Sequence, residues 1–198
     1  KDYNNKPNHT TILPYTRLLS APMDYTPGIF NLKDYRYNSP SDRTINTSHH
    51  IPSTIAKELA LYVVIYAPVQ MAADLPQNYE EHLDAFSFIL DVPTDWDKTI
   101  ALNGEIGKYI TVVRRDINSS DWYLGSITNE EARELEIDLS FLDPRKSYQA
   151  TIYKDPIDGG WESNPEQVVI DDIVVDRKSK YKIILPPGGG QAIKFSEK

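Results

Sequence analysis

The sequence predicts two parts of different fold class, an α/β part over residues 1–92 and an antiparallel all-β sandwich over residues 93–198. In the first part, apolar side chains recur every three or four residues, which is the spacing of one face of a helix. After Pro93 they recur at every second residue, and clusters of Asn, Asp, Gly and Pro separate the alternating segments. This change of period places the domain boundary between Val92 and Asp97.

Residues 10–30 are predicted to form a helix and then a strand. Thr10 or Thr11 can cap a helix that ends by Pro22, because a hydroxyl oxygen can accept a hydrogen bond from a free amide of the first turn. Residues 23–28 end in Pro–Gly and suit a short strand that leads directly into a turn. The apolar residues at helical spacing are Ile12, Tyr15, Leu18 and Leu19.

A long loop and a second helix are expected next. Residues 31–52 lack periodicity and are predicted to form a loop of about 20 residues, a length that is usually functional or flexible. Ser53 or Thr54 can cap the helix that follows, and Pro68 is expected to kink or end it. The inward face of this helix is predicted to carry Ile55, Leu59, Tyr62, Val63 and Tyr66.

A third helix is predicted over residues 79–90 and closes at Pro93. Its apolar residues Leu83, Phe86 and Ile89 share one face and are expected to point toward the core. The first part of the chain is therefore predicted to contain three helices and one strand.

Eight strands are predicted after Pro93, each bounded by turn-forming residues. The clearest alternation is in residues 134–141, where every second residue is apolar and the residues between are mostly charged. Seven or eight short strands at this spacing are typical of an antiparallel β-sandwich. The predicted strands are residues 99–102, 109–115, 122–127, 134–141, 148–154, 167–175, 181–185 and 192–195.

The composition argues against several classes of function. The net charge is −8 over 198 residues and no long basic run occurs, so a nucleic-acid partner is not expected. The longest apolar run, residues 59–67, is far shorter than the ~20 residues that span a bilayer, so no membrane segment is expected. Cysteine is absent, which excludes a disulfide framework, a thiol nucleophile and a thiolate metal site.

Several long stretches of the chain resemble glycoside hydrolase family 97. They begin with HTTILPYTRLL and PMDYTPGIF within residues 9–30, STIAKELALYVVIYAPVQMAADLPQNYE at residues 53–80 and AFSFILDVPTDWD at residues 85–97. DWYLGSIT at residues 121–128, YQATIYKD from residue 148 and PPGGGQAI near the end continue the resemblance in order. The likeness is to the C-terminal portion of such enzymes, and it is greatest to the starch-utilisation α-glucosidase branch.

The resemblance implies an enzyme with an N-terminal β-sandwich, a central (β/α)₈ barrel and a C-terminal β-sandwich. Residues 1–92 are then expected to be the last helices and strand of the barrel, and residues 93–198 the C-terminal sandwich. In the glucosidase branch, hydrolysis depends on calcium and inverts the anomeric carbon: one glutamic acid protonates the leaving oxygen while glutamates on the other face activate water. The resemblance further implies a bacterial enzyme, periplasmic or secreted, that acts on α-linked oligosaccharides of the starch type.

No residue of this chain matches the catalytic or calcium-binding glutamates of the family, which are expected upstream of Lys1. The catalytic groups and the calcium ligands are therefore expected in a preceding, N-terminal part of the same enzyme, which is the partner that this chain requires. Residues 1–198 alone are expected to be inactive as a hydrolase.

Four residues are predicted to line the substrate cleft: Asp24, Tyr25, His9 and Arg17. Asp24 and Tyr25 end the predicted strand, and barrel enzymes place their chemistry at the strand ends. The alternative is that Asp24 caps the following turn and Tyr25 packs against the sandwich. His9 can hydrogen-bond a sugar hydroxyl or orient a carboxylate, although a histidine at the start of a helix also commonly has a structural role.

Two other functions are left open at this point. Within the family, a retaining branch acts on α-galactosides through a carboxylate nucleophile. From a different class, the sandwich is a non-catalytic carbohydrate-binding or structural module. In a binding module Trp122, Tyr123 and Trp161 would form a platform for sugar rings, whereas otherwise they belong to the core.

Overall fold

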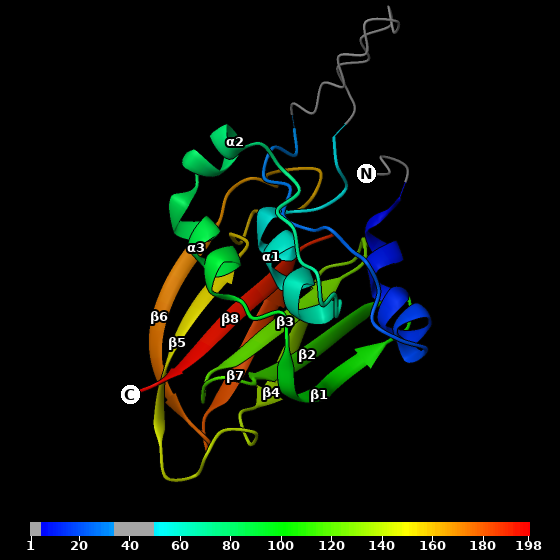
Figure 1. Ribbon diagram of the computed structural model, residues 1–198. Coiled ribbons are helices and arrows are strands. Elements are labelled where there is room, and N and C mark those ends of the chain that lie inside the picture. The colour runs from blue at the N-terminus through cyan, green and yellow to red at the C-terminus, as the bar shows by residue number, and fades with distance from the viewer. Residues whose placement is uncertain (1–4, 34–49) are drawn as a thin grey trace, which may run out of the picture.

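The structure, a computed structural model, describes residues 5–33 and 50–198. Six antiparallel strands form one sheet in the order β1-β2-β3-β8-β5-β6, and β4 and β7 form a second sheet. Helices lie on one face of the large sheet and the small sheet lies on the other (Figure 1). The strands are β1 (Trp96–Glu105), β2 (Tyr109–Asp116), β3 (Trp122–Thr128), β4 (Arg133–Asp138), β5 (Ser147–Lys154), β6 (Val169–Asp176), β7 (Lys180–Leu185) and β8 (Gly190–Glu197).

The helices precede the strands in the chain. Three short 3₁₀ helices come first, and three α-helices follow after residue 50. None of the helices in the described ranges is long and apolar enough to cross a membrane. The helices are η1 (Pro7–Thr11), η2 (Leu13–Tyr15), η3 (Arg17–Leu19), α1 (Ile55–Val64), α2 (Pro76–Glu80) and α3 (Leu83–Asp91).

The predicted antiparallel sandwich is confirmed, and each of the eight predicted strands has a counterpart within a few residues of its expected ends. The register aligns one aliphatic residue from each of four neighbouring strands, and these residues face the small sheet. Cross-strand neighbours of this kind are a main source of sheet stability. The row consists of Val113, Leu124, Ile193 and Ile152.

Both faces of the large sheet are buried, and β3 is buried at all seven residues. Tyr123 and Ile127 face the helices, whereas Trp122 and Leu124 face the small sheet. The two faces therefore belong to two different apolar cores. The second core is covered by residues of β4, of the turn that follows β4, and of β7. They include Ile137, Leu139, Leu142, Ile183 and Leu185.

The helix α1 is the centre of the first core. It begins as predicted, because Thr54 is the N-cap residue and its Oγ1 accepts a hydrogen bond of 3.1 Å from the amide of Lys57. It ends at Val64, four residues before Pro68. All ten of its residues are buried against the sheet and the surrounding chain.

Small residues of the sheet allow α1 to approach closely. On the helical face, Gly125 of β3 pairs with Ala192 of β8, so that neither strand has a large side chain at this pair of positions. A Cβ atom added to Gly125 would lie 2.5 Å from the carbonyl oxygen of Ala60 and 3.0 Å from Cβ of Val63. Since no Cβ atom tolerates these distances, the position of α1 requires glycine at residue 125.

The prediction of one helix over residues 10–22 is wrong, because the segment forms the three short 3₁₀ helices instead. Pro14 has no amide hydrogen, and its ring disfavours a continuous α-helix through this region. Hydroxyl groups also compete for the local carbonyls: Thr11 Oγ1 donates to the oxygen of Asn8, and Thr16 Oγ1 donates to the oxygen of Ile12.

Residues 23–28 do not form the predicted strand. Their backbone–backbone bonds are isolated ones, from the amide of Met23 to the oxygen of Tyr66 and from the amide of Ala73 to the oxygen of Pro27. A strand needs a neighbouring strand for its ladder, and the described residues provide none here. The long loop predicted over residues 31–52 lies mostly outside the described residues.

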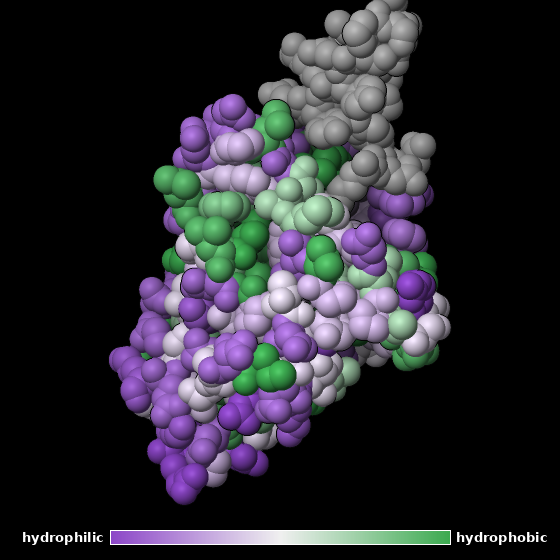
Figure 2. Space-filling model, viewed as in Figure 1, coloured by the Kyte–Doolittle hydropathy of each residue, from purple (hydrophilic) through white to green (hydrophobic). Residues whose placement is uncertain are grey.

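The third predicted helix is divided into α2 and α3 around His82, whose backbone is not helical. The division changes the buried face, so that Ala85 and Phe88 are buried while Leu83 is 63% exposed. The prediction that Leu83 points inward is therefore wrong, whereas Phe86 and Ile89 do pack partly against the core. Figure 2 shows apolar side chains gathered on the surface over α3.

Replacing Gly125 by alanine is expected to push α1 away from the sheet. Overpacking of this kind typically costs about 1–3 kcal/mol of the free energy of unfolding, which urea unfolding of the purified protein would measure. Ala101→Val adds bulk at an exposed position of β1 and is the matched control, with an expected change within about 0.5 kcal/mol. An unchanged midpoint for Gly125→Ala would contradict the described packing.

Candidate functional site

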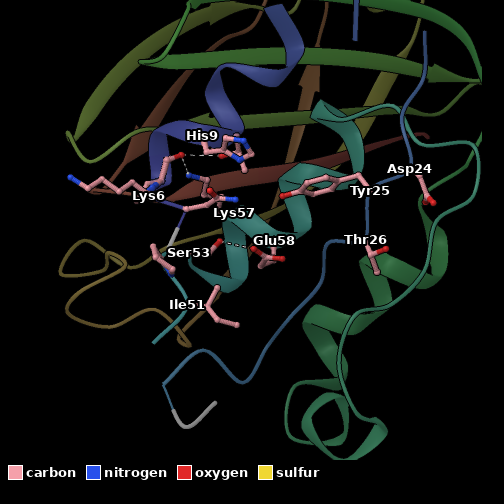
Figure 3. A pocket seen from close by; sticks show the side chains of 13 residues that line it. Lys6, His9, Asp24, Tyr25, Thr26, Ile51, Ser53, Lys57 and Glu58 are labelled. Atoms are coloured by element: carbon pink, nitrogen blue, oxygen red, sulfur yellow. Dashed lines mark hydrogen bonds between the residues drawn. The ribbon is translucent and has the colours of Figure 1, made fainter. Parts of the chain in front are cut away.

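A cavity of about 410 Å³ lies where three segments meet. These are the chain around η1, residues 24–26, and the residues that lead into the first turn of α1 (Figure 3). Charged and hydroxyl side chains dominate its labelled wall. Its lining residues are Asn5, Lys6, Pro7, His9, Thr10, Asp24, Tyr25, Thr26, Ile51, Pro52, Ser53, Lys57 and Glu58.

Three of the four predicted cleft residues line this cavity, namely His9, Asp24 and Tyr25. Arg17 does not: it lies on the exposed η3, where its Nη1 donates a hydrogen bond of 3.2 Å to the oxygen of Ala21. The structure thus brings together residues from two sequence motifs. That they contact a sugar stays a prediction.

Tyr25 is partly buried, and its environment keeps the phenol protonated. Burial raises the pKa of Tyr25 well above its usual value, and the negative charge of Glu58 raises this pKa further. A protonated phenol can donate a hydrogen bond as well as accept one. Asp24 beside it is exposed and has a carboxylate that can accept hydrogen bonds.

Sequence reasoning missed Glu58, which is only 2% exposed and lies on the cavity wall. Its Oε1 accepts a hydrogen bond of 2.7 Å from Ser53 Oγ, and its Oε2 accepts from the amides of Gly28 at 2.8 Å and Ile29 at 3.3 Å. A fully buried glutamate requires such partners, because burying an unpaired charge is very costly. The available signal was a Lys–Glu pair inside an otherwise apolar helix.

Lys57 was missed as well, and it is 1% exposed. Its Nζ donates hydrogen bonds of 3.0 Å to the oxygen of Pro7 and 2.9 Å to the oxygen of Thr128. Burial lowers the pKa of Lys57 to about 8, against the opposing effect of nearby carboxylates. This ammonium joins η1, α1 and β3, and it thereby positions the floor of the cavity.

Asp155 is a third buried ionisable group, located after the end of β5. Its Oδ2 accepts a hydrogen bond of 2.9 Å from the amide of Gly190 at the start of β8. Burial raises the pKa of Asp155 to about 7, while the hydrogen bonds it accepts and the charge of Lys57 act in the opposite direction. Near neutral pH this carboxyl therefore changes its protonation inside the fold.

The residues that the structure describes do not gather into a calcium site. Among the residues that the structure describes, no group of three or more His, Asp or Glu side chains is placed to hold a metal ion. Calcium requires six to eight oxygen ligands, and the most buried cavity carboxylate, Glu58, already accepts three hydrogen bonds. Any calcium ligands must come mainly from residues other than these.

The three aromatic residues considered as a sugar platform do not form one. Trp122 and Tyr123 are buried on opposite faces of β3, in the two separate cores. Trp161 packs against Gly188, where an added Cβ would lie 2.4 Å from Cδ1 of its ring. The interpretation of Trp122 and Tyr123 as core residues is confirmed, and a flat carbohydrate-binding surface is absent from this set.

Comparison with known proteins places the chain among glycoside hydrolases. A family model described as the C-terminal, oligomerisation domain of glycosyl-hydrolase 97 matches residues 95–196. The retaining α-galactosidase of Bacteroides thetaiotaomicron is 35% identical over 188 residues, which are 94% of this chain and 27% of that protein. A probable retaining α-galactosidase of Streptomyces bingchenggensis is 30% identical over 135 residues, 68% of this chain and 19% of that protein.

Solved structures agree with this class. A family 97 enzyme from Pseudoalteromonas sp. strain K8, seen in complexes with panose and with acarbose, is 44% and 45% identical with TM-scores of 0.89 and 0.88. Each alignment covers 98% of this chain and 29% of that chain. A β-arabinopyranosidase, 24% identical over 95% of this chain and 27% of its own, has the same fold with a TM-score of 0.76.

All of these matches are to glycoside hydrolases. More specifically, the chain belongs to glycoside hydrolase family 97, as the match of more than half of its residues to the family model shows. The chain spans less than a third of the length of these relatives.

Protonation of Asp155 is expected to make stability depend on pH. The folded carboxyl keeps its proton up to about pH 7, whereas the unfolded one loses it near 3.8, so the folded state binds the extra proton between these values. Its contribution to the free energy of unfolding therefore falls as pH rises from about 4 to about 7. Asp155→Asn is expected to remove this fall, a difference on the order of 3 kcal/mol.

Urea unfolding of both proteins at several pH values from 4 to 7 measures this difference. The exposed Asp158, in the turn that follows Asp155, provides the control variant Asp158→Asn, for which the pH dependence of the unsubstituted protein is expected. An identical pH dependence in Asp155→Asn would show that Asp155 is ionised in the fold throughout this range.

Proposed function

We propose that this chain is the C-terminal part of an enzyme that hydrolyses α-glucosidic bonds of starch-like oligosaccharides. The observation that carries the proposal is the 44–45% identity, over 98% of the chain, to a family 97 enzyme that binds panose and acarbose. Panose contains α-linked glucose units, so the ligand class of that relative is the proposed substrate class of this protein.

The proposed architecture places residues 1–92 at the end of a (β/α)₈ barrel and residues 93–198 in the C-terminal sandwich. Its support is that residues 24–26 precede α1 in the chain and meet its first turn at the cavity, because loops between a strand and the next helix form the catalytic face of a barrel. In that architecture the cavity between residues 24–26 and the start of α1 would open on this face. The rest of the enzyme is the proposed partner, and the exposed Leu83 and Leu90 of α3 offer it apolar surface.

The proposed reaction is inverting and calcium-dependent, with its carboxylic acid, its water-activating carboxylates and its calcium ligands outside this chain. Residues of this chain contribute one wall of the cleft. Asp24 accepts hydrogen bonds from sugar hydroxyls, the protonated phenol of Tyr25 donates one, and His9 faces the same space. We further propose a periplasmic or secreted location, as in the family that the chain resembles.

A retaining α-galactosidase is the second candidate function. It is favoured by the 35% and 30% identity to two proteins described as retaining α-galactosidases. The identity to the enzyme that binds panose and acarbose is higher and covers slightly more of the chain, which favours the glucosidase. No feature of the sandwich favours a separate binding module, since Trp122 and Tyr123 are buried.

Hydrolysis assays on the full-length enzyme test the proposal directly. We expect release of the aryl group from an aryl α-glucoside, loss of activity on chelation of calcium, and initial formation of β-glucose by NMR. Preference for an aryl α-galactoside with retention of configuration would establish the second candidate instead. Residues 1–198 purified alone are expected to be inactive on either substrate, and activity of this piece would contradict the proposed role.

Within the full-length enzyme, Asp24→Ala is expected to lower kcat/KM for a starch oligosaccharide roughly tenfold or more, because a hydrogen bond to a charged group contributes about 1.5–3 kcal/mol. Arg17→Ala is the matched control, since Arg17 lies outside the cavity, and a change below about twofold is expected. Equal effects of the two substitutions on kcat/KM would show that Asp24 does not contact the substrate.

A further inference from the structure

Six successive backbone amides of residues 28–33 donate their hydrogen bonds to only three carboxylates. The amides pair up along the chain, and each pair shares one carboxylate oxygen. Glu58 Oε2 accepts from Gly28 at 2.8 Å and from Ile29 at 3.3 Å. Asp74 Oδ2 accepts from the next two amides, those of residues 30 and 31, both at 2.8 Å. Glu166 Oε1 accepts from the last two, those of residues 32 and 33, both at 2.8 Å.

These amide–carboxylate bonds take the place of the backbone hydrogen bonds that a strand would make with a neighbouring strand. In an extended strand, successive residues face opposite sides, so two neighbouring amides reach one oxygen only where the backbone turns. Residues 28–33 are accordingly not a strand, although Ile29, Phe30 and Leu32 are buried. Buried amides without partners are costly, and the carboxylates satisfy all six.

The three carboxylates come from separate parts of the fold. Glu58 belongs to α1, Asp74 precedes α2, and Glu166 lies in the chain before β6. Glu166 is 134 residues from Leu32 in the sequence. The sandwich therefore takes part directly in holding a segment that precedes α1.

The carbonyl groups at the start of this segment are held as well. The oxygen of Pro27 accepts from Tyr62 Oη at 3.1 Å and from the amide of Ala73 at 3.2 Å, and the oxygen of Gly28 accepts from Tyr79 Oη at 2.7 Å. Gly28 has a φ of 92°, a left-handed conformation that favours glycine. Both sides of the backbone are thus fixed directly beside Thr26, which lines the cavity.

We propose that Glu58, Asp74 and Glu166 are positioning residues for the cavity wall: by fixing residues 28–33 they set the direction in which Asp24, Tyr25 and Thr26 face an oligosaccharide. The proposal rests on the proposed function, because it assigns these three carboxylates a role in binding the same substrate. They act through hydrogen bonds to the backbone and not through their charge. Glu166 uses a single oxygen for this purpose, so an amide oxygen can replace it.

Glu166 offers the sharpest test, since neither it nor its partners Leu32 and Lys33 line the cavity. In the full-length enzyme, Glu166→Ala is expected to raise KM for a starch oligosaccharide about five- to tenfold with kcat changed less than about twofold. Glu166→Gln keeps an acceptor oxygen and is expected to stay within twofold of the unsubstituted enzyme. Glu162→Ala removes an exposed carboxylate from the same loop and is the matched control.

Hydrogen exchange of the amides of residues 28–33 in the same full-length proteins gives a readout that does not depend on activity. Exchange at least tenfold faster in Glu166→Ala, and unchanged in Glu166→Gln and Glu162→Ala, is expected. Faster exchange with an unchanged KM would overturn the positioning role while leaving the proposed function intact. Failure of Glu166→Gln to restore KM would also overturn it, since charge would then be required.

The two proposals fail in different ways. Preference of the unsubstituted enzyme for α-galactosides would overturn the proposed glucosidase, and the same KM comparison would then be made with an α-galactoside. Inactivity on both substrates would overturn the proposed function together with the role in substrate binding. Unchanged exchange of the six amides in Glu166→Ala would overturn the positioning role, whatever the substrate is.

Discussion

The close contact between α1 and the centre of the large sheet is the constraint on which the remaining structure depends. Gly125 and Ala192 leave the space that the helix fills, and every residue of the helix is buried as a result. A helix held this rigidly can carry charged groups at defined positions. Its first turn therefore presents Lys57 toward η1 and β3 and Glu58 toward Gly28, and both side chains line the cavity.

Ionisable side chains hold irregular backbone here through hydrogen bonds. Lys57 binds two carbonyl oxygens, whereas Glu58, Asp74 and Glu166 bind amides of a segment that has no strand partner. Such contacts contribute modest net stability, since desolvation offsets much of their strength, but they permit few alternative arrangements. The regular sandwich supplies most of the apolar burial, and the charged contacts determine the shape of the cavity beside it.

The sandwich was predictable from the sequence because alternation and turn residues are local signals, and the cap at Thr54 is another. The structure of residues 10–22 was not predictable. Their apolar residues recur at helical spacing, but Pro14 and neighbouring hydroxyl groups prevent a continuous α-helix. Lys57 and Glu58 were missed for a different reason. From the local sequence alone, a Lys–Glu pair is expected to be exposed to solvent. Its burial becomes possible only through contacts with residues far along the sequence, such as Thr128.

The position of β8 in the large sheet has a consequence for how the chain folds. This strand is synthesised after the other seven, yet it lies between β3 and β5 and pairs with both. The large sheet therefore stays in two pieces, each with an unpaired edge, until β8 has left the ribosome. Contacts of such long sequence separation form slowly, so the nascent protein exposes aggregation-prone edges for longer than a chain of sequential hairpins does.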